Sequence, residues 1–240
     1  FLEDGRFELL GRLDRIVKLE EKRISLPLLE QALATHEWVS EARLGVVREN
    51  RASLGALVVL SASGVHALRN QGRRALTQAL RQHLVPHCEA LALPRRWRLL
   101  SHLPLNAQGK LPQALIETLL VSPRTQAPDL VAQEQHGDEL RLELIVPLDL
   151  AHFPGHFPGT PILPGVVQVD WAMNLSQRLM DLPPHFAGME VLKFQQLVRP
   201  GDRISLTLRF DPERSKLHFA YRNGEAACSS GRILLVNADA

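Results

Sequence analysis

The segment His156–Gly165, with the sequence His-Phe-Pro-Gly-Thr-Pro-Ile-Leu-Pro-Gly, restricts the fold more than any other part of this chain. Its three prolines fix φ and remove three backbone donors, so the segment is neither a regular helix nor a central strand. An apolar stretch follows that contains one acid, Asp170, five residues after the last glycine. The pattern predicts a stiff loop that leads into a helix starting at Val166.

A histidine in a rigid loop and a carboxylate on the following helix are suited to act as a base and an acid. The unpaired N–H groups near Gly165 and Val166, at the start of the helix, are suited to receive a partial negative charge. The helix is mostly apolar, and we expect it to be buried on most sides. Burying the charged side chain of Asp170 in such a helix would cost free energy, unless it is paired or takes part in the chemistry.

This motif resembles the signature of the hotdog-fold 3-hydroxyacyl-acyl-carrier-protein dehydratases, H-F-P-G-x-P-x-x-P-G with an acid five residues further on. The acid is usually Glu in the stand-alone enzymes, whereas Asp170 is similar to the bifunctional dehydratase–isomerases. Val191–Leu208 resembles a second family pattern, K-F-x-x-x-V-x-P-G-D-x-L. The resemblance covers about residues 138–240. The loop residues that match are His156, Phe157, Pro158, Gly159, Pro161, Pro164 and Gly165.

The resemblance implies elimination of water from a 3-hydroxyacyl thioester to give the trans-2-enoyl thioester, without a cofactor. His156 would take the C2 proton, and Asp170 would bind the 3-hydroxyl and assist its departure. The N–H groups at Gly165 and Val166 would polarise the thioester carbonyl. In the family, the histidine and the acid come from opposite subunits. The resemblance therefore implies a homodimer or larger assembly, with an acyl carrier protein as partner.

The tetrapeptide His-Phe-Pro-Gly occurs twice in tandem, beginning at His152 and at His156. Only the second copy continues into Pro-x-x-Pro-Gly and reaches the acid at the family spacing. We therefore assign the catalytic role to His156. His152 is interpreted as a loop or packing residue.

The first half of the chain carries a different pattern. Gly11–Glu30 resembles the hinge motif of adenylate-forming ligases, G-R-x-D-x-x-[IV]-K-x-x-G-x-R-I, although Glu21 stands at the usual second glycine. The segment Leu103-Pro-Leu-Asn-Ala-Gln-Gly-Lys-Leu resembles the terminal motif P-x-[TN]-x-x-G-K of the same superfamily. Together these motifs bracket a small C-terminal subdomain over about residues 1–120.

The ligase resemblance implies that Asp14 is the hinge, that Arg12 lies near the ribose, and that Lys110 contacts the acyl carboxylate and the phosphate. A lysine ammonium suits this last role because it is a point charge on a flexible stem. No phosphate loop is found here, and the chain begins at Phe1 in what looks like the middle of an element. We expect a piece of a longer ligase. ATP and Mg²⁺ would belong to that parent and would not bind this chain alone.

The predicted fold class is α+β, with two domains. A ligase-type subdomain is expected at residues 1–121, a polar linker at 122–137 and a hotdog domain at 138–240. In the hotdog domain, a helix at 166–180 would be wrapped by an antiparallel sheet. Two other functions stay open. The chain could be a fragment of an acyl-CoA or acyl-carrier-protein synthetase, with the ligase half as the functional one, or a dimerising module that binds thioesters without catalysis.

Charge and composition narrow the partners. Residues 1–125 hold 18 Lys and Arg against 12 Asp and Glu, whereas residues 126–240 hold 10 against 14. The basic half is suited to an acidic carrier protein, or is simply solvated surface. Interleaved aromatic residues and known reader motifs are missing, which argues against nucleic acid. The two cysteines fit a reducing cytoplasm, no apolar run is long enough for a membrane span, and we expect no metal site.

Overall fold

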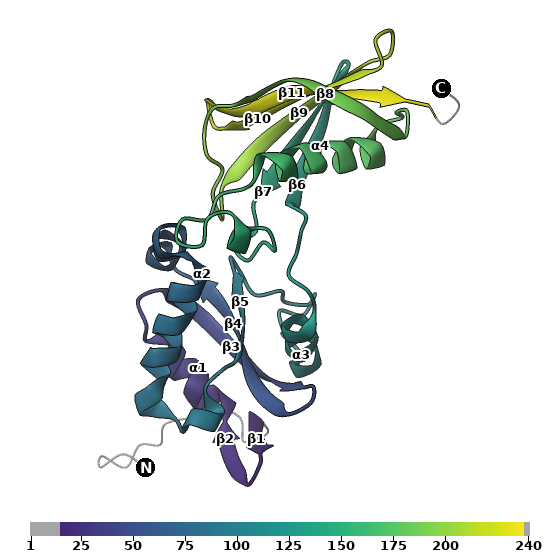
Figure 1. The fold of residues 1–240 in the computed structure, drawn as a ribbon. Helices are drawn as coiled ribbons and strands as arrows, with labels where there is room; N and C mark the ends of the chain where they lie inside the picture. The colour runs from purple at the N-terminus through teal and green to yellow at the C-terminus, as the bar shows by residue number, and fades with distance from the viewer. Residues whose placement is uncertain (1–14, 238–240) are drawn as a thin grey trace. The chain divides into compact units, whose positions relative to one another are not determined.

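The computed structural model describes residues 15–237 of the chain. The chain divides into two compact units, Phe1–Pro123 and Arg124–Ala240, which are described separately below. Both combine helices with predominantly antiparallel sheets (Figure 1), so the predicted α+β class is confirmed.

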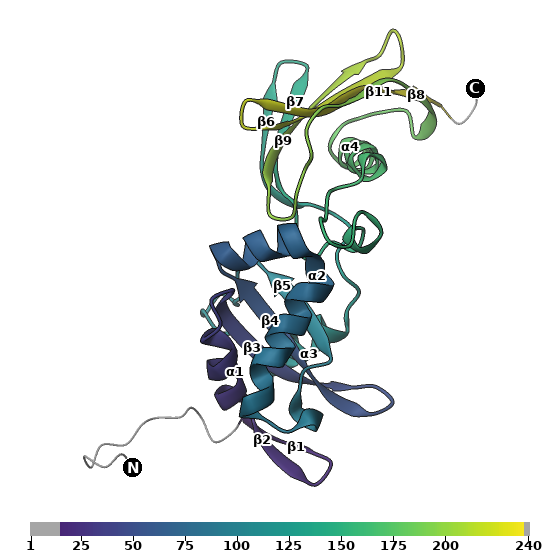
Figure 2. The ribbon, with the colours of Figure 1, turned by 60° about the vertical axis from the view of Figure 1, so that its left-hand side comes forward.

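The first unit is built on a three-stranded sheet in the order β3-β4-β5. Helices α1 and α2 cover one face and α3 covers the other (Figure 2). Strand β4 is buried over most of its length, as expected for a central strand with a helix on each side. The elements of the sheet and its helices are α1 (Leu26–Ala34), β3 (Val39–Arg48), β4 (Ala52–Leu60), α2 (Ala62–Leu84), β5 (Arg96–Leu100) and α3 (Gln113–Val121).

Two glycines determine how closely α3 lies on this sheet. Gly45 and Gly55 face each other across β3 and β4. A Cβ atom at Gly45 would lie 2.9 Å from Ile116, and one at Gly55 would lie 2.7 Å from Leu120. Because only hydrogen atoms project there, the helix can pack directly against the backbone. The remaining elements of this unit are a small hairpin, β1 (Ile16–Leu19) and β2 (Lys22–Ser25), and the 3₁₀ turns η2 (Val85–His87) and η3 (Ala90–Ala92).

The second unit is a six-stranded antiparallel sheet with one long helix, α4, on one face (Figure 1). The strand order is β6-β7-β9-β10-β11-β8, which leaves β6 and β8 at the two edges. This is the arrangement predicted for a hotdog domain. Its elements are β6 (Asp129–His136), β7 (Glu139–Ile145), η4 (Phe153–Gly155), α4 (Gly165–Leu179), β8 (His185–Phe194), β9 (Arg203–Asp211), β10 (Lys216–Asn223) and β11 (Ala226–Val236).

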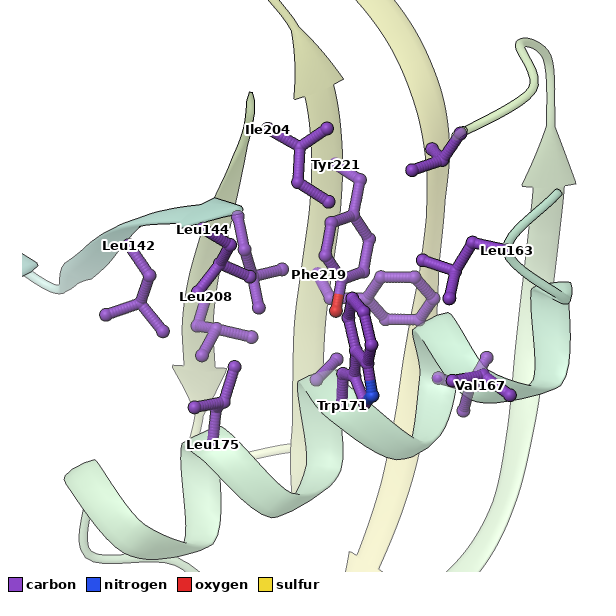
Figure 3. Packing of buried hydrophobic residues seen from close by; sticks show 14 of the residues in the cluster. Leu142, Leu144, Leu163, Val167, Trp171, Leu175, Ile204, Leu208, Phe219 and Tyr221 are labelled. Atoms are coloured by element: carbon purple, nitrogen blue, oxygen red, sulfur yellow. The ribbon is translucent and has the colours of Figure 1, made fainter. Parts of the chain in front are cut away.

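The core of the second unit lies between the sheet and α4. Alternate residues of β7, β9 and β10 point toward the helix, following the period of two seen in the sequence. Trp171 and Leu175 project from α4 into this layer, and Leu163 enters it from the loop before the helix (Figure 3). Because Leu163 is part of the core, the proline-rich loop is tied directly to the packing of the unit.

Half of the predicted linker, residues 122–137, is a strand, because Asp129–His136 forms the edge strand β6. All eight residues of this strand are exposed, so no face requires apolar side chains and the sequence shows no alternation. The residues just before the strand are also bonded to this unit. The Trp171 indole N–H donates to the Gln126 carbonyl at 2.7 Å, and the Ala151 N–H donates to the Thr125 carbonyl at 2.8 Å.

Candidate active site

The proline-rich loop is closed by its own backbone and hydrogen-bonded to the irregular segment between β8 and β9. The Ile162 N–H donates to the His156 carbonyl at 2.9 Å. The Leu163 N–H donates to the Val198 carbonyl at 2.8 Å, and the Arg199 Nε–H donates to the Pro161 carbonyl at 2.9 Å. These bonds hold a loop whose prolines already limit its backbone, as the sequence predicts.

The two copies of His-Phe-Pro-Gly have different structures. In the first copy, Phe153 is only 4% exposed and begins the 3₁₀ turn η4. In the second copy, Phe157 is 59% exposed and its ring lies beside that of His156, with 5.2 Å between the centroids. His156 is half-buried, and its N–H donates to the Phe153 carbonyl at 3.0 Å. The first copy thus anchors the core, whereas the second presents its side chains at the surface.

Helix α4 starts at Gly165, one residue before the predicted start. Its first turn is closed by the Pro164 carbonyl, which accepts from the N–H groups of Val167 and Gln168 at 3.1 Å each. The N–H groups of Gly165 and Val166 have no acceptor among residues 15–237. A helix start with free N–H groups is a site for a developing negative charge.

Gly165 leaves room for the ring of an aromatic residue. A Cβ atom at this position would lie 2.6 Å from the ring of Phe194, at the end of β8. By contrast, a Cβ atom at Gly159 would have no neighbour within 4 Å. The Phe194 ring therefore packs directly against the backbone at the helix start, where a glycine has only hydrogen atoms. The loop near Gly159 has no such neighbour.

The prediction that α4 is buried on most sides is wrong, because Asp170 is exposed in the single chain. It belongs to an exposed stripe spaced four residues apart, together with Val166, which is 71% exposed, and Asn174. Since α4 is covered by one sheet only, the opposite face of the helix meets no other element of this unit. Burial, and to a smaller extent the charge of Asp170, raises the pKa of the neighbouring Tyr221 well above its ordinary value.

The structure places His156 and Asp170 on consecutive elements but does not join them. Both residues are described, and no hydrogen bond or ion pair connects their side chains. The loop and the helix start lie together, whereas the predicted base and acid do not contact each other within one chain.

The sequence interpretation missed a buried polar group next to this site. Gln168, two residues before Asp170, bonds the loop and strand β11 from inside the core. Its signal was present, because it is the only polar side chain in the run Val166–Val169 at the start of a mostly apolar helix. Such a residue is expected to have partners.

In the first unit, Lys110 lies at the exposed end of a tight turn between β5 and α3. The Asn106 carboxamide oxygen accepts from the N–H groups of Gln108 at 3.0 Å and Lys110 at 2.9 Å. Gly109 has φ +69°, which favours glycine. The turn therefore presents the lysine to solvent. Asp14 and Arg12, the other two predicted ligase residues, lie outside the described residues.

A cavity of about 290 Å³ lies on the face of the second unit's sheet that points away from α4. It contains neither His156 nor Asp170. Burial and the nearby guanidinium groups of Arg209 and Arg232 lower the pKa of His218, which lines it. Glu139 also lines this cavity, and Glu190 forms an ion pair with Arg232 at 3.5 Å.

Within residues 15–237, no group of three or more His, Cys, Asp or Glu is arranged to hold a metal ion. No helix in the same range is both long and apolar enough to cross a membrane.

Comparison with known proteins identifies the second unit. The family model of the ApeI-like dehydratases matches residues 132–232. A 3-hydroxyacyl-[acyl-carrier-protein] dehydratase, FabZ, of Oenococcus oeni is 30% identical over 119 residues, which cover 45% of this chain and 86% of the relative. The chain belongs to this dehydratase family through its second unit.

Two solved structures resemble separate parts of the chain. The dehydratase heterocomplex ApeI:P from Xenorhabdus doucetiae is 34% identical over 45% of this chain and 96% of its own, with a TM-score of 0.41. An acyl-CoA synthetase of Brucella canis is 26% identical over 50% of this chain, with a TM-score of 0.39. The chain spans only 21% of that synthetase, whereas it covers 86% of the Oenococcus oeni dehydratase.

Proposed function

We propose that the dehydratase unit acts on a 3-hydroxyacyl thioester carried by an acyl carrier protein, with His156 as the base. The main support is the pair of free N–H groups at Gly165 and Val166, at the end of the loop that carries His156. A C2 proton next to a thioester is weakly acidic, so its removal requires both a base and stabilisation of the charge that develops on the carbonyl oxygen.

In the proposed reaction, the C2–H bond breaks and its proton passes to the His156 imidazole. The thioester oxygen gains negative charge, which the N–H groups of Gly165 and Val166 stabilise together with the helix dipole. Asp170 hydrogen-bonds to the 3-hydroxyl and assists the cleavage of the C3–O bond. The His156 imidazolium then gives this proton to the departing hydroxyl group, which leaves as water, so that the base is regenerated and the C2–C3 double bond forms without a cofactor.

We also propose that the active unit is a homodimer or larger assembly. Asp170 is exposed and is not bonded to His156 in one chain, so a second copy would complete the site. Strand β8 supplies a surface for that contact, because it is an open sheet edge that carries several exposed apolar side chains. These are Phe186, Met189, Val191 and Phe194.

For the first unit, we propose the small C-terminal subdomain of an adenylate-forming ligase. Its support is the pair of sequence motifs and the presentation of Lys110 on an exposed, glycine-shaped turn. Adenylation itself would need the nucleotide-binding part of the parent protein, with ATP and Mg²⁺. The free cysteines, Cys88 and Cys228, are consistent with a reducing compartment such as the cytoplasm.

The test is turnover of a 3-hydroxyacyl carrier-protein thioester to its 2-enoyl product by the 240-residue chain. His156→Ala is expected to lower kcat by at least about 100-fold, as loss of a general base does. His152→Ala is the matched control, from the identical tetrapeptide, and should retain activity. Loss of activity in the His152 variant alone would move the base to the first copy. No turnover by the unmodified chain, confirmed as a dimer in solution, would favour a thioester-binding module.

A further inference from the structure

The Gln168 side chain links three segments from inside the core of the dehydratase unit. It is 3% exposed. Its amide nitrogen donates to the Leu163 carbonyl at 3.2 Å, in the proline-rich loop. Its amide oxygen accepts from the Ser229 hydroxyl at 2.6 Å, on β11. Both ends of the amide are therefore satisfied, one by the loop and one by the sheet.

The same turn of α4 is held a second time through its backbone. The Tyr221 hydroxyl, fully buried on β10, donates to the Gln168 carbonyl at 2.9 Å. This bond fixes the helix two residues before Asp170. Polar groups in a core stabilise the protein little compared with apolar side chains of the same volume, and each becomes costly when a partner is lost. The main effect of these hydrogen bonds is therefore to fix the position of the backbone, and their contribution to stability is small.

The loop peptide bonded by Gln168 is the one that sets the start of the helix. The Leu163 carbonyl is held by Gln168, and the Leu163 N–H is bonded to Val198 on the other side. Two residues later, the Gly165 and Val166 N–H groups point out of the helix without an acceptor. With both polar groups of Leu163 fixed, the directions of these two donors are restricted as well.

We infer that Gln168, supported by Ser229, is a positioning residue for the dehydration, which aims the Gly165 and Val166 N–H groups at the thioester oxygen. The inference rests on the proposed function. Gln168 does not touch the substrate, and its effect passes through the Leu163 peptide. A preorganised oxyanion donor contributes about 10²–10³-fold to kcat, so even a small displacement is measurable.

The decisive variant is Gln168→Glu, because a protonated carboxyl group has the shape and the bonding pattern of the amide. Its hydroxyl would donate to the Leu163 carbonyl and its other oxygen would accept from Ser229. The ionised form would repel the Leu163 carbonyl. Burial raises the pKa of a carboxyl group, so both forms are reached in the working range.

The readout is the ratio of kcat in the variant to kcat in the wild type at each pH. We expect a ratio below about 0.1 at alkaline pH, on the scale of a weakened oxyanion donor. The ratio should rise toward one as the pH falls and the glutamic acid is protonated, while KM stays within about threefold of the wild-type value, since ground-state binding is unchanged. Both enzymes use the same catalytic base, so its titration affects both kcat values equally and cancels from the ratio. The rise therefore reports the protonation of residue 168.

Gln168→Met removes both bonds without adding a charge, and keeps the test valid if the glutamate variant does not fold. Its ratio should be low and independent of pH. Gln177→Glu is the matched control on the same helix, because its amide also donates to a carbonyl, that of Pro184 at 2.8 Å, but at an exposed position. Its ratio should stay near one throughout.

A folded Gln168→Met dimer with kcat within twofold of wild type would overturn the inference. So would a Gln168→Glu ratio that does not change with pH. A wild-type chain without turnover would instead overturn the proposed function, which separates the two failures.

Discussion

The tandem copies of His-Phe-Pro-Gly have the same four residues but different environments. Phe153 is part of the hydrophobic core and its glycine, Gly155, ends a 3₁₀ turn. Phe157 is exposed, and its copy continues through the proline-rich loop to Gly165 and α4. The tetrapeptide itself therefore specifies neither packing nor chemistry. The segments that follow each copy, and the side chains that meet them, decide its role.

The largest expected effect separates the two phenylalanines. Phe153→Ala should lower the free energy of unfolding by about 3–5 kcal/mol, because it leaves a cavity in the core. Phe157→Ala, at the same position of the second copy, should change it by no more than about 0.5 kcal/mol in the single chain. Denaturant unfolding of both variants measures the difference. Equal losses would show that the second phenylalanine is also a core residue.

A smaller effect is expected at two glycines, Gly155 in the first copy and Gly165 at the end of the loop that continues the second copy. Gly165→Ala places a methyl group against the Phe194 ring and should destabilise the fold by about 1–3 kcal/mol, with a loss of kcat. Gly155→Ala meets no atom within 4 Å and should leave both quantities unchanged. Thermal melting and turnover provide the measurements. Adding Phe194→Ala to Gly165→Ala should recover most of the lost stability, and a double variant no more stable than the single one would contradict the steric explanation.

The smallest effect is expected at Arg199, whose side chain clamps the loop of the second copy by its hydrogen bond to Pro161. Arg199→Met removes the bond to the buried Pro161 carbonyl and should destabilise the unit by about 1 kcal/mol. Arg203→Met, which removes an exposed ion pair with Glu143, is the control and should cost no more than about 0.5 kcal/mol. Equal shifts in urea midpoint for the two variants would mean that the loop does not depend on this clamp.

Local sequence signals predicted the elements around the site well. Prolines limit φ and a run of apolar residues follows them, so a stiff loop and a helix near Val166 could be predicted, and α4 begins at Gly165. The strands of the second unit alternate with period two because one face meets α4. Strand β6 gives no such signal, since both of its faces are exposed and its identity depends on pairing with β7.

Asp170 and Gln168 show a different limit. Both are polar residues in one apolar helix, and the sequence could not say which of them points inward. The expected buried acid is exposed, and the overlooked amide is buried and bonded at both ends. Residues two apart lie about 200° apart around a helix, so only one of the two can face the sheet. The packing of Trp171 and Leu175 against the sheet decides that this is Gln168.

The two-part character of this chain, the stiff loop and the residue types of the site can all be predicted without a structure, because they depend on local backbone restriction and on motif spacing. The tertiary structure decided which His-Phe-Pro-Gly copy enters the core, that Asp170 faces away from its own sheet, and that Gln168 reaches the loop. Each of these depends on contacts between residues distant in sequence, such as Gln168 with Ser229, and such contacts leave no periodic pattern along the chain.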